Sequence, residues 1–281
     1  MYLCPMITAG EYHTLTVLRK VEFGLYLDDG DKGILLPNRF VPSNAKPGDS
    51  LKVFIYHDSE DRLIATTENP KAIAGEIVKL KVVSITEQGA FMDMGLMKDL
   101  FVPLSQQKTK LMVRGEYLVN IYIDKRTGRM AGTEKFDSLL SNEALTVKEK
   151  EIVDLIVYRR TDIGYVVIIN NIHTGILHHN EIYRSITSGD KFQGFIKKIY
   201  SDNRIDVAAG KPGIERVLDA TGVILQLLNE NEGFLPYHDK SNPDDIYAFF
   251  GISKKNFKMT IGNLFRQKLI LIESDGIRLV K

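Results

Sequence analysis

The sequence of 281 residues has very little cysteine and no long apolar run. Its only cysteine, Cys4, cannot form an intramolecular disulfide, and a single thiol also excludes a zinc site built from several cysteines. No apolar stretch reaches the roughly 18 residues of a membrane-spanning helix. The first residues, MYLCPMITAG, lack the basic region and apolar stretch of a secretion signal. We therefore expect a cytoplasmic protein that does not partner a membrane.

Excess charge of one sign is also missing. The 37 Lys and Arg residues are balanced by 36 Asp and Glu residues, which leaves a formal net charge of +1. Binding through counterion release requires cations clustered at the phosphates of a nucleic acid. Any nucleic-acid contact must therefore depend on local basic patches and on stacking rather than on a summed field.

The sequence does contain one unit that is repeated three times. In each copy a glycine within a strand-like alternation is followed, 13 or 14 residues later, by a proline or histidine. These pairs are Gly24 and Pro37, Gly89 and Pro103, and Gly164 and His178. Each copy then has a turn glycine followed, 14 or 15 residues later, by an arginine. These pairs are Gly48 and Arg62, Gly115 and Arg129, and Gly189 and Arg204. Matched spacing in three places indicates a structural repeat.

Each repeat contains about five short strands rich in Val, Ile, Phe and Tyr, separated by Gly, Asp and Asn turns. The predicted first strands are 12–20, 76–85 and 151–160, and 135–144 is at most a linker helix. Five such strands can close into a small antiparallel barrel of the OB type, which hides its strand edges. The sequence thus predicts a mainly β fold with barrels at 1–70, 71–145 and 146–213.

The last block, 214–281, changes to a helical period. A first helix is predicted to stop at Gly233, a second begins with Asn242 as N-cap and Pro243 at its first position, and Gly251 ends it. A third helix begins after Ser253. The chain ends in a hairpin for which Asp275 and Gly276 are the predicted turn residues. This arrangement predicts an α+β winged-helix domain.

The second repeat carries the motifs QGAFMDMG and DLFVPLS. They resemble the signature of the S1 RNA-binding domain, a subtype of the OB fold. The resemblance implies that single-stranded RNA crosses the second and third strands, where aromatic rings, a histidine and late-strand basic residues contact it. The match is uneven, because the family histidine is kept only as His178, and Tyr165 lies one residue out of register. The residues carried over as candidate RNA contacts are Phe23, Tyr26, Arg62, Phe91, Phe101, Arg129, Tyr165, His178, Lys197, Lys198 and Arg204.

Physical reasoning leaves two interpretations of these rings open. Phe23 and Tyr26 have opposite strand parity, so we expect a bulge at Gly24 if they are to share the solvent face. Rings on that face can stack on the bases of a single strand, which are hidden in a duplex. Alternatively, the rings fill the barrel core or a domain interface. The histidine and the basic residues are equally compatible with an ordinary solvated surface.

The third helix of the last block is the most basic segment, with Lys254, Lys255 and Lys258 and no acid between 253 and 268. It is a candidate for reading duplex DNA in a major groove, for contacting the RNA backbone, or for a protein contact. Three S1-like units followed by a winged helix resemble the conserved virulence factor B family, and this resemblance implies RNA binding and an influence on gene expression.

No catalytic or metal centre is expected. The three units and the last block use up the chain, and the stretch GKPG at 210–213 lacks the spacing of a phosphate-binding loop. The histidines have no cysteine or acid spaced for zinc. We therefore expect a protein that is not an enzyme, has no cofactor or metal, and binds single-stranded RNA. The alternatives are a transcriptional regulator that binds DNA through its winged helix, and an adaptor for the ribosome or polymerase.

Overall fold

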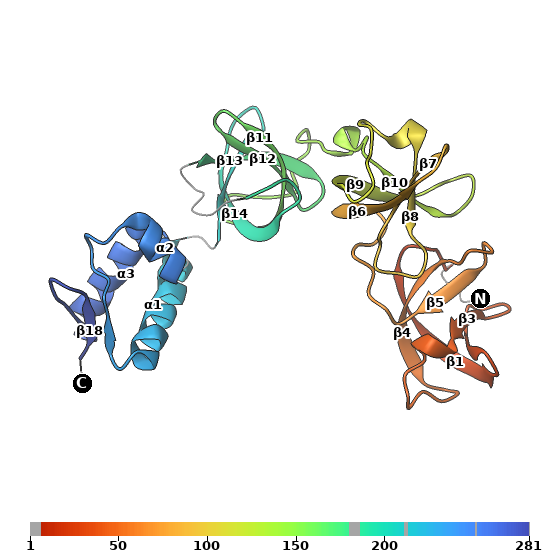
Figure 1. The fold of residues 1–281 in the computed structure, drawn as a ribbon, viewed down its shortest axis with the longest axis horizontal. Helices are drawn as coiled ribbons and strands as arrows, with labels where there is room; N and C mark the ends of the chain where they lie inside the picture. The colour runs from red at the N-terminus through yellow and green to blue at the C-terminus, as the bar shows by residue number, and fades with distance from the viewer. Residues whose placement is uncertain (1–6, 180–185, 211–212, 251, 281) are drawn as a thin grey trace. The chain divides into compact units, whose positions relative to one another are not determined.

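The computed structural model describes residues 7–179, 186–210, 213–250 and 252–280. The chain forms three closed five-stranded barrels followed by a helical domain with a small sheet, which confirms the mainly β prediction (Figure 1). Two compact units are present: residues 1–140 hold barrels 1 and 2, and residues 141–281 hold barrel 3 and the helical domain. The finer division into four domains stays a prediction.

The three barrels share one strand order. Barrel 1 consists of β1 (Tyr12–Val21), β2 (Gly24–Leu27), β3 (Ile34–Pro37), β4 (Ser50–His57) and β5 (Leu63–Thr66). Barrel 2 consists of β6 (Ile77–Ile85), β7 (Gly89–Met92), β8 (Leu100–Pro103), β9 (Glu116–Ile123) and β10 (Met130–Thr133). Barrel 3 consists of β11 (Ile152–Thr161), β12 (Gly164–Ile169), β13 (His173–His178), β14 (Lys191–Ile199) and β15 (Ile205–Ala209). In each, the fifth strand pairs with both the third and the fourth, which closes the sheet.

Short 3₁₀ helices follow the third strand in barrels 1 and 2, at η1 (Asn38–Phe40) and η2 (Leu104–Gln106). The segment predicted to be at most a linker helix contains only η3 (Asp137–Leu139). The predicted first strands agree with β1, β6 and β11 to within one residue at each end.

Alternation along the second strand divides core from surface. In β7, Ala90 and Met92 are fully buried while Phe91 between them is only half-buried. In β2, Leu25 and Leu27 are buried and Tyr26 is half-buried in the same way. Successive side chains on a strand point to opposite faces. The rings of Phe91 and Tyr26 therefore lie outside the cores of their barrels.

The strand glycines have a different role from the predicted bulge. The register between β2 and β3 runs without interruption through Gly24, and the shift lies instead in β1, between Val17 and Arg19. A Cβ at Gly24 would lie 2.2 Å from the Leu36 carbonyl oxygen, and one at Gly89 would lie 2.3 Å from the Val102 oxygen. Glycine is therefore required by the close approach of two strands. Phe23 reaches the face of Tyr26 because it occupies the tight turn before β2.

The last domain contains α1 (Gly213–Glu230), β16 (Phe234–Leu235), α2 (Pro243–Phe250), α3 (Lys254–Arg266), β17 (Ile270–Ile272) and β18 (Ile277–Leu279). The predicted cap of α3 is confirmed, because Ser253 Oγ accepts a hydrogen bond from the Asn256 backbone N–H at 3.2 Å. The predicted terminator Gly251 lies outside the described residues. None of the described helices is long and apolar enough to cross a membrane.

The terminal hairpin differs in detail from its prediction. The Glu273 N–H donates to the Gly276 carbonyl at 2.8 Å, so the turn residues are Ser274 and Asp275, one position earlier than predicted. A Cβ at Gly276 would lie 2.2 Å from the Leu235 carbonyl oxygen. Glycine is needed there because β16 pairs with β18, which makes the sheet three-stranded rather than a two-stranded ribbon.

Barrels 1 and 2 pack together through an apolar cluster on the outer face of barrel 1. Phe54, Tyr56 and Ile64 are 0%, 3% and 7% exposed, although the first two point away from the core of their own barrel. Leu96 and Met130 of barrel 2 pack against them. Burial of large apolar side chains is the main stabilising contribution to such a contact, at about 1.5–3 kcal/mol for each fully buried side chain.

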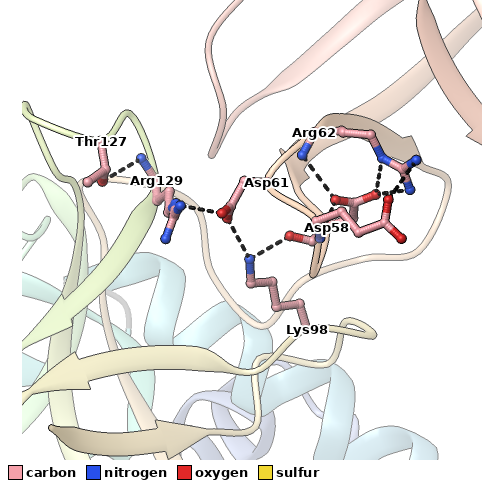
Figure 2. A network of polar contacts seen from close by, with 7 residues as sticks. Asp58, Asp61, Arg62, Lys98, Thr127 and Arg129 are labelled. Atoms are coloured by element: carbon pink, nitrogen blue, oxygen red, sulfur yellow. Dashed lines mark hydrogen bonds and ion pairs between the residues drawn. The ribbon is translucent and has the colours of Figure 1, made fainter.

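A polar network borders this apolar cluster. Asp61, in the turn between β4 and β5, accepts from the guanidinium of Arg129 and lies 3.7 Å from the ammonium of Lys98 (Figure 2). Lys98 Nζ also donates to the Asp58 carbonyl oxygen at 2.6 Å. Two cations of barrel 2, one just before β8 and one just before β10, are thus anchored to one turn of barrel 1.

Candidate nucleic-acid interface

The clearest candidate surface lies on β7 and β8 of barrel 2. Phe91 and Phe101 are directly opposite partners in the strand pair, with ring centroids 5.0 Å apart and planes tilted by 41°. Both rings are half-buried and lie outside the barrel core, which contains Leu100 and Val102. A Cβ at Gly89 would lie 2.8 Å from Phe101 Cε2. The absence of a side chain at Gly89 therefore makes room for the ring of Phe101.

These rings line a hollow of about 400 Å³. Barrel 2 contributes Phe91 and Phe101 together with Lys98, Asp99 and Arg129, and barrel 1 contributes Tyr56 and His57 from the end of β4. The volume is within the range of about 300–1,000 Å³ for small-molecule sites. The hollow therefore combines an aromatic wall, the three cations Lys98, Arg126 and Arg129, and several polar side chains in one place.

Two groups from barrel 1 have altered pKa values in this hollow. Burial, with a smaller contribution from Glu68, raises the pKa of Tyr56 to about 12. Burial, followed by the charges of Lys98 and Arg129, lowers the pKa of the His57 imidazole below its ordinary 6.5. At neutral pH the phenol therefore keeps its proton and the imidazole is uncharged.

Barrel 1 displays its own pair of rings. Phe23 is 56% exposed, and its ring lies 6.4 Å from that of half-buried Tyr26 in an edge-to-face arrangement. The Arg19 guanidinium lies 4.5 Å from the centroid of the Tyr26 ring. Neither ring belongs to the core of the barrel. Proteins that bind single-stranded nucleic acids combine such rings, on which bases stack, with cations that contact the phosphates.

Barrel 3 has aliphatic side chains at the positions equivalent to the ring pair of barrel 2. Val166 and Ile176 are opposite partners there. Tyr165 packs half-buried against the barrel core, and its ring edge meets His179 at 5.6 Å. His178 is the last residue of β13, and its Nε2 lies 3.1 Å from Asp206 Oδ1. This barrel therefore shows a histidine held by a carboxylate rather than an aromatic platform.

Basic residues gather around Tyr200 in barrel 3. Lys198 Nζ lies 4.5 Å and Arg204 Cζ 5.2 Å from the centroid of the Tyr200 ring. The Tyr200 hydroxyl donates to Asp206 Oδ2 at 2.9 Å, and this hydrogen bond is the largest cause that raises the pKa of the phenol. The adjacent Lys197 is also exposed. The candidate basic residues of this barrel thus lie around one tyrosine ring.

The three arginines predicted from the repeat each pair with an aspartate. Arg62 Nη2 lies 2.7 Å from Asp58 Oδ2, and Arg204 Nε lies 2.7 Å from Asp202 Oδ2, both within the preceding turn. Arg129 instead pairs with Asp61 of barrel 1. Such pairing neutralises part of their positive field, and their role as RNA contacts stays a prediction.

Helix α3 buries one face, and Lys255 and Lys258 are exposed outside that face. Asn256, Phe257, Thr260 and Ile261 are buried. Lys255 and Lys258 are exposed, Lys254 is half-buried, and Lys258 Nζ lies 3.7 Å from Asp239. No acid lies in the first turn. Cations at a helix N-terminus oppose the helix dipole, so this charge does not favour the helix itself, whereas a phosphate bound nearby would offset it.

Comparison with known proteins places the chain in a family. Residues 9–68 match the S1 domain family and residues 222–279 match the CvfB-like winged helix domain family. YitL of Bacillus subtilis, an uncharacterized protein, is 29% identical over 277 residues, which cover 94% of this chain and 91% of YitL. Conserved virulence factor B of Staphylococcus aureus strain USA300 is 30% identical over 242 residues, which cover 83% of this chain and 80% of that protein. The chain belongs to the conserved virulence factor B family.

A solved structure also matches this family member. A multidomain protein with nucleic acid binding domains from Streptococcus pneumoniae TIGR4 is 23% identical, with a TM-score of 0.41, and the match covers 97% of this chain and 98% of that one. The matched domain families, S1 and winged helix, are nucleic-acid-binding domains rather than known enzymes, and they support nucleic-acid binding by the chain.

Some residues of the candidate interface of this family member were not predicted from the sequence. Tyr56 and His57 lie on β4, where Val53, Phe54, Ile55 and Tyr56 are all apolar or aromatic and all buried. A strand that is apolar on both faces is covered on both sides. This signal predicts that another element packs on the outside of barrel 1. Asp99 and Tyr200 offered no comparable signal, because single polar residues in turns are common.

Proposed function

We propose that this protein binds single-stranded RNA in the cytoplasm, without catalysing a reaction, and influences gene expression after transcription. Bases stack on the outward rings of barrels 1 and 2, and the basic residues of barrel 3 and α3 contact the phosphates. Linking several weak sites in one chain raises the overall affinity above that of any single barrel.

The observation that carries this proposal is the pair Phe91 and Phe101. These rings lie on the strands that the S1 resemblance assigns to RNA, outside the barrel core and along a hollow with Lys98 and Arg129. Stacking on an aromatic ring stabilises a bound base by about 1–3 kcal/mol with little sequence preference. Single strands present unstacked bases for such contacts, whereas a duplex hides them.

A second function is favoured by one specific feature. The lysines at the start of α3 resemble the cations of a recognition helix, so the winged helix is a candidate for binding duplex DNA in a regulator of transcription. In that case the barrels would serve as protein contacts. The rings displayed on barrels 1 and 2 support RNA as the first choice.

Competition binding separates the two functions. The full chain is titrated with labelled single-stranded RNA while unlabelled RNA or duplex DNA of equal length competes at fixed salt. We expect the RNA to compete at least about tenfold better than the DNA. A preference for duplex DNA that disappears when Lys254, Lys255 and Lys258 are changed to alanine would overturn the proposal in favour of the regulator.

A further inference from the structure

Two polar atoms from barrel 1 are buried next to the hollow without a hydrogen-bond partner. Within the part of the chain that the structure describes, these are the Tyr56 hydroxyl and His57 Nδ1. Tyr56 as a whole is only 3% exposed. Folded proteins pair the large majority of such atoms with protein or water. Both residues line the hollow, so a ligand that enters it can supply the missing partners.

A carboxylate lines the same hollow. Asp99 is half-buried, and no hydrogen bond or ion pair of its side chain is found among the described residues. Burial raises the pKa of Asp99, and the charge of Asp93 adds to this effect. Lys98 and Arg129, two of the three cations that line the hollow, pair with Asp61 rather than with Asp99. The carboxylate thus offers acceptor atoms that the protein leaves unused.

Another part of the lining is apolar. It is formed by Phe91 and Phe101 together with Met94, Leu96 and Leu100. A nucleobase matches this combination, because its faces stack on aromatic rings and its edge carries hydrogen-bond donors and acceptors. An aliphatic or purely anionic ligand would leave either the rings or the unpaired acceptors without a partner.

We propose that the hollow is a composite pocket, built by both barrels, for one unstacked base that bears an exocyclic amino group. The base stacks on the rings of barrel 2, and its edge is held by the Tyr56 hydroxyl, His57 Nδ1 and the Asp99 carboxylate. A carboxylate only accepts hydrogen bonds. The amino group of adenine, cytosine or guanine satisfies it, whereas uracil presents two carbonyl oxygens and a single ring N–H. This inference rests on the proposed function, since the base belongs to a bound RNA strand.

The chain offers clean variants for testing this pocket. Tyr56→Phe removes only a hydroxyl that has no partner in the protein, so the fold loses no hydrogen bond. Asp99→Asn keeps the shape of the side chain and replaces one acceptor with a donor. Tyr12→Phe is the matched control, because the Tyr12 hydroxyl donates to Asn69 Oδ1 at 3.0 Å and does not line the hollow.

The test measures binding of the full chain by fluorescence anisotropy. The probes are an oligouridylate of about twelve nucleotides and three versions with a single central adenine, cytosine or guanine. We expect at least one substituted strand to bind about fivefold more tightly than the oligouridylate, which is the contribution of one net hydrogen bond. Tyr56→Phe and Asp99→Asn should bring this ratio close to one, and Tyr12→Phe should leave it unchanged.

The remaining outcomes are decisive against one proposal or the other. Equal binding of all four strands by the wild type, or a preference that survives both pocket variants, overturns the pocket and leaves the proposed function intact. If none of the four strands binds, the proposed function itself is overturned. If free AMP, CMP or GMP displaces the strand and UMP does not, the pocket is assigned to free nucleotides. That result overturns the proposal that the pocket holds a base of a bound strand.

Discussion

The first two barrels and the third barrel have the same five strands in the same order but differ on their outer faces. At the outward position of the second strand, barrels 1 and 2 carry Tyr26 and Phe91, whereas barrel 3 carries Val166. In the fourth strand, Tyr56 of barrel 1 pairs with Ile64, and the matching position of barrel 3, which pairs with Asp206, carries Lys198. At the outward position of the second strand, the rings are therefore confined to barrels 1 and 2, and exposed lysines mark the face of barrel 3.

This difference teaches that the strand framework and the surface are determined separately. The glycines and inward aliphatic residues that close a barrel are present in all three copies. The outward positions are free to vary, because they contribute little to the core of their own barrel. We infer that the barrels divide the work: the first two stack bases and the third supplies cations.

The largest expected effect concerns the packing of barrel 1 on barrel 2. Phe54→Ala should lower the free energy of unfolding of residues 1–140 by about 3–5 kcal/mol, because the ring is fully buried between the barrels. Phe195→Ala, at the equivalent position of barrel 3, should cost less than half as much since Phe195 is half-buried. Differential scanning calorimetry measures both. Equal losses would show that the outer face of β4 has no special role.

The next effect concerns stacking. Phe91→Ala should weaken binding of single-stranded RNA by about 1–3 kcal/mol, since one stacking surface is lost. Val166→Ala, at the matching position of barrel 3, should leave the affinity nearly unchanged. Fluorescence anisotropy gives the affinities, and calorimetry checks the fold. Normal affinity of the Phe91 variant together with a lower unfolding temperature would assign that ring to packing instead.

A smaller effect is expected for the cations of barrel 3. Changing both Lys197 and Lys198 to alanine should reduce the slope of log affinity against log salt by about 1.4, since each phosphate contact on a single strand contributes about 0.7. Lys191→Ala, at the start of the same strand, serves as the control. Titrations across a range of salt concentrations measure the slope. An unchanged slope for the double variant would remove β14 from the interface.

The smallest effect concerns the polar network between barrels 1 and 2. Asp61→Asn should lower the stability of residues 1–140 by no more than about 1 kcal/mol, because exposed ion pairs contribute little. Asparagine also tolerates the left-handed backbone of this position, where φ is 64°. Asp31→Asn, in an exposed turn, is the control in the same calorimetric measurement. A loss of several kcal/mol would mean that the network, rather than the apolar cluster, joins the barrels.

Much of the fold could be predicted because its signals are local. Strand alternation identified β1, β6 and β11, and the cap at Ser253 identified the start of α3. The bulge expected at Gly24 was wrong because close contact of neighbouring strands, which no local pattern records, decides where glycine is required. The turn of the terminal hairpin was misplaced for the same reason, since the sequence does not show that β16 approaches Gly276.

The candidate site was predicted only in part. Placing Phe91 and Phe101 on neighbouring strands needed only the repeat and the S1 resemblance. The contribution of Tyr56 and His57 depends on how barrel 1 packs against barrel 2, which is a contact between residues far apart in the sequence. The aspartates that pair with the predicted arginines were missed likewise, because charge complementarity across a turn or an interface leaves no periodic pattern.

The central claim is that RNA crosses the outward rings of the barrels, and a photo-crosslinking map of single-stranded RNA on the full chain tests it most directly. The account predicts crosslinked nucleotides on β2, β7 and β8, with Tyr26, Phe91 and Phe101 among the modified residues. Crosslinks confined to α3, with none on those three strands, would contradict it.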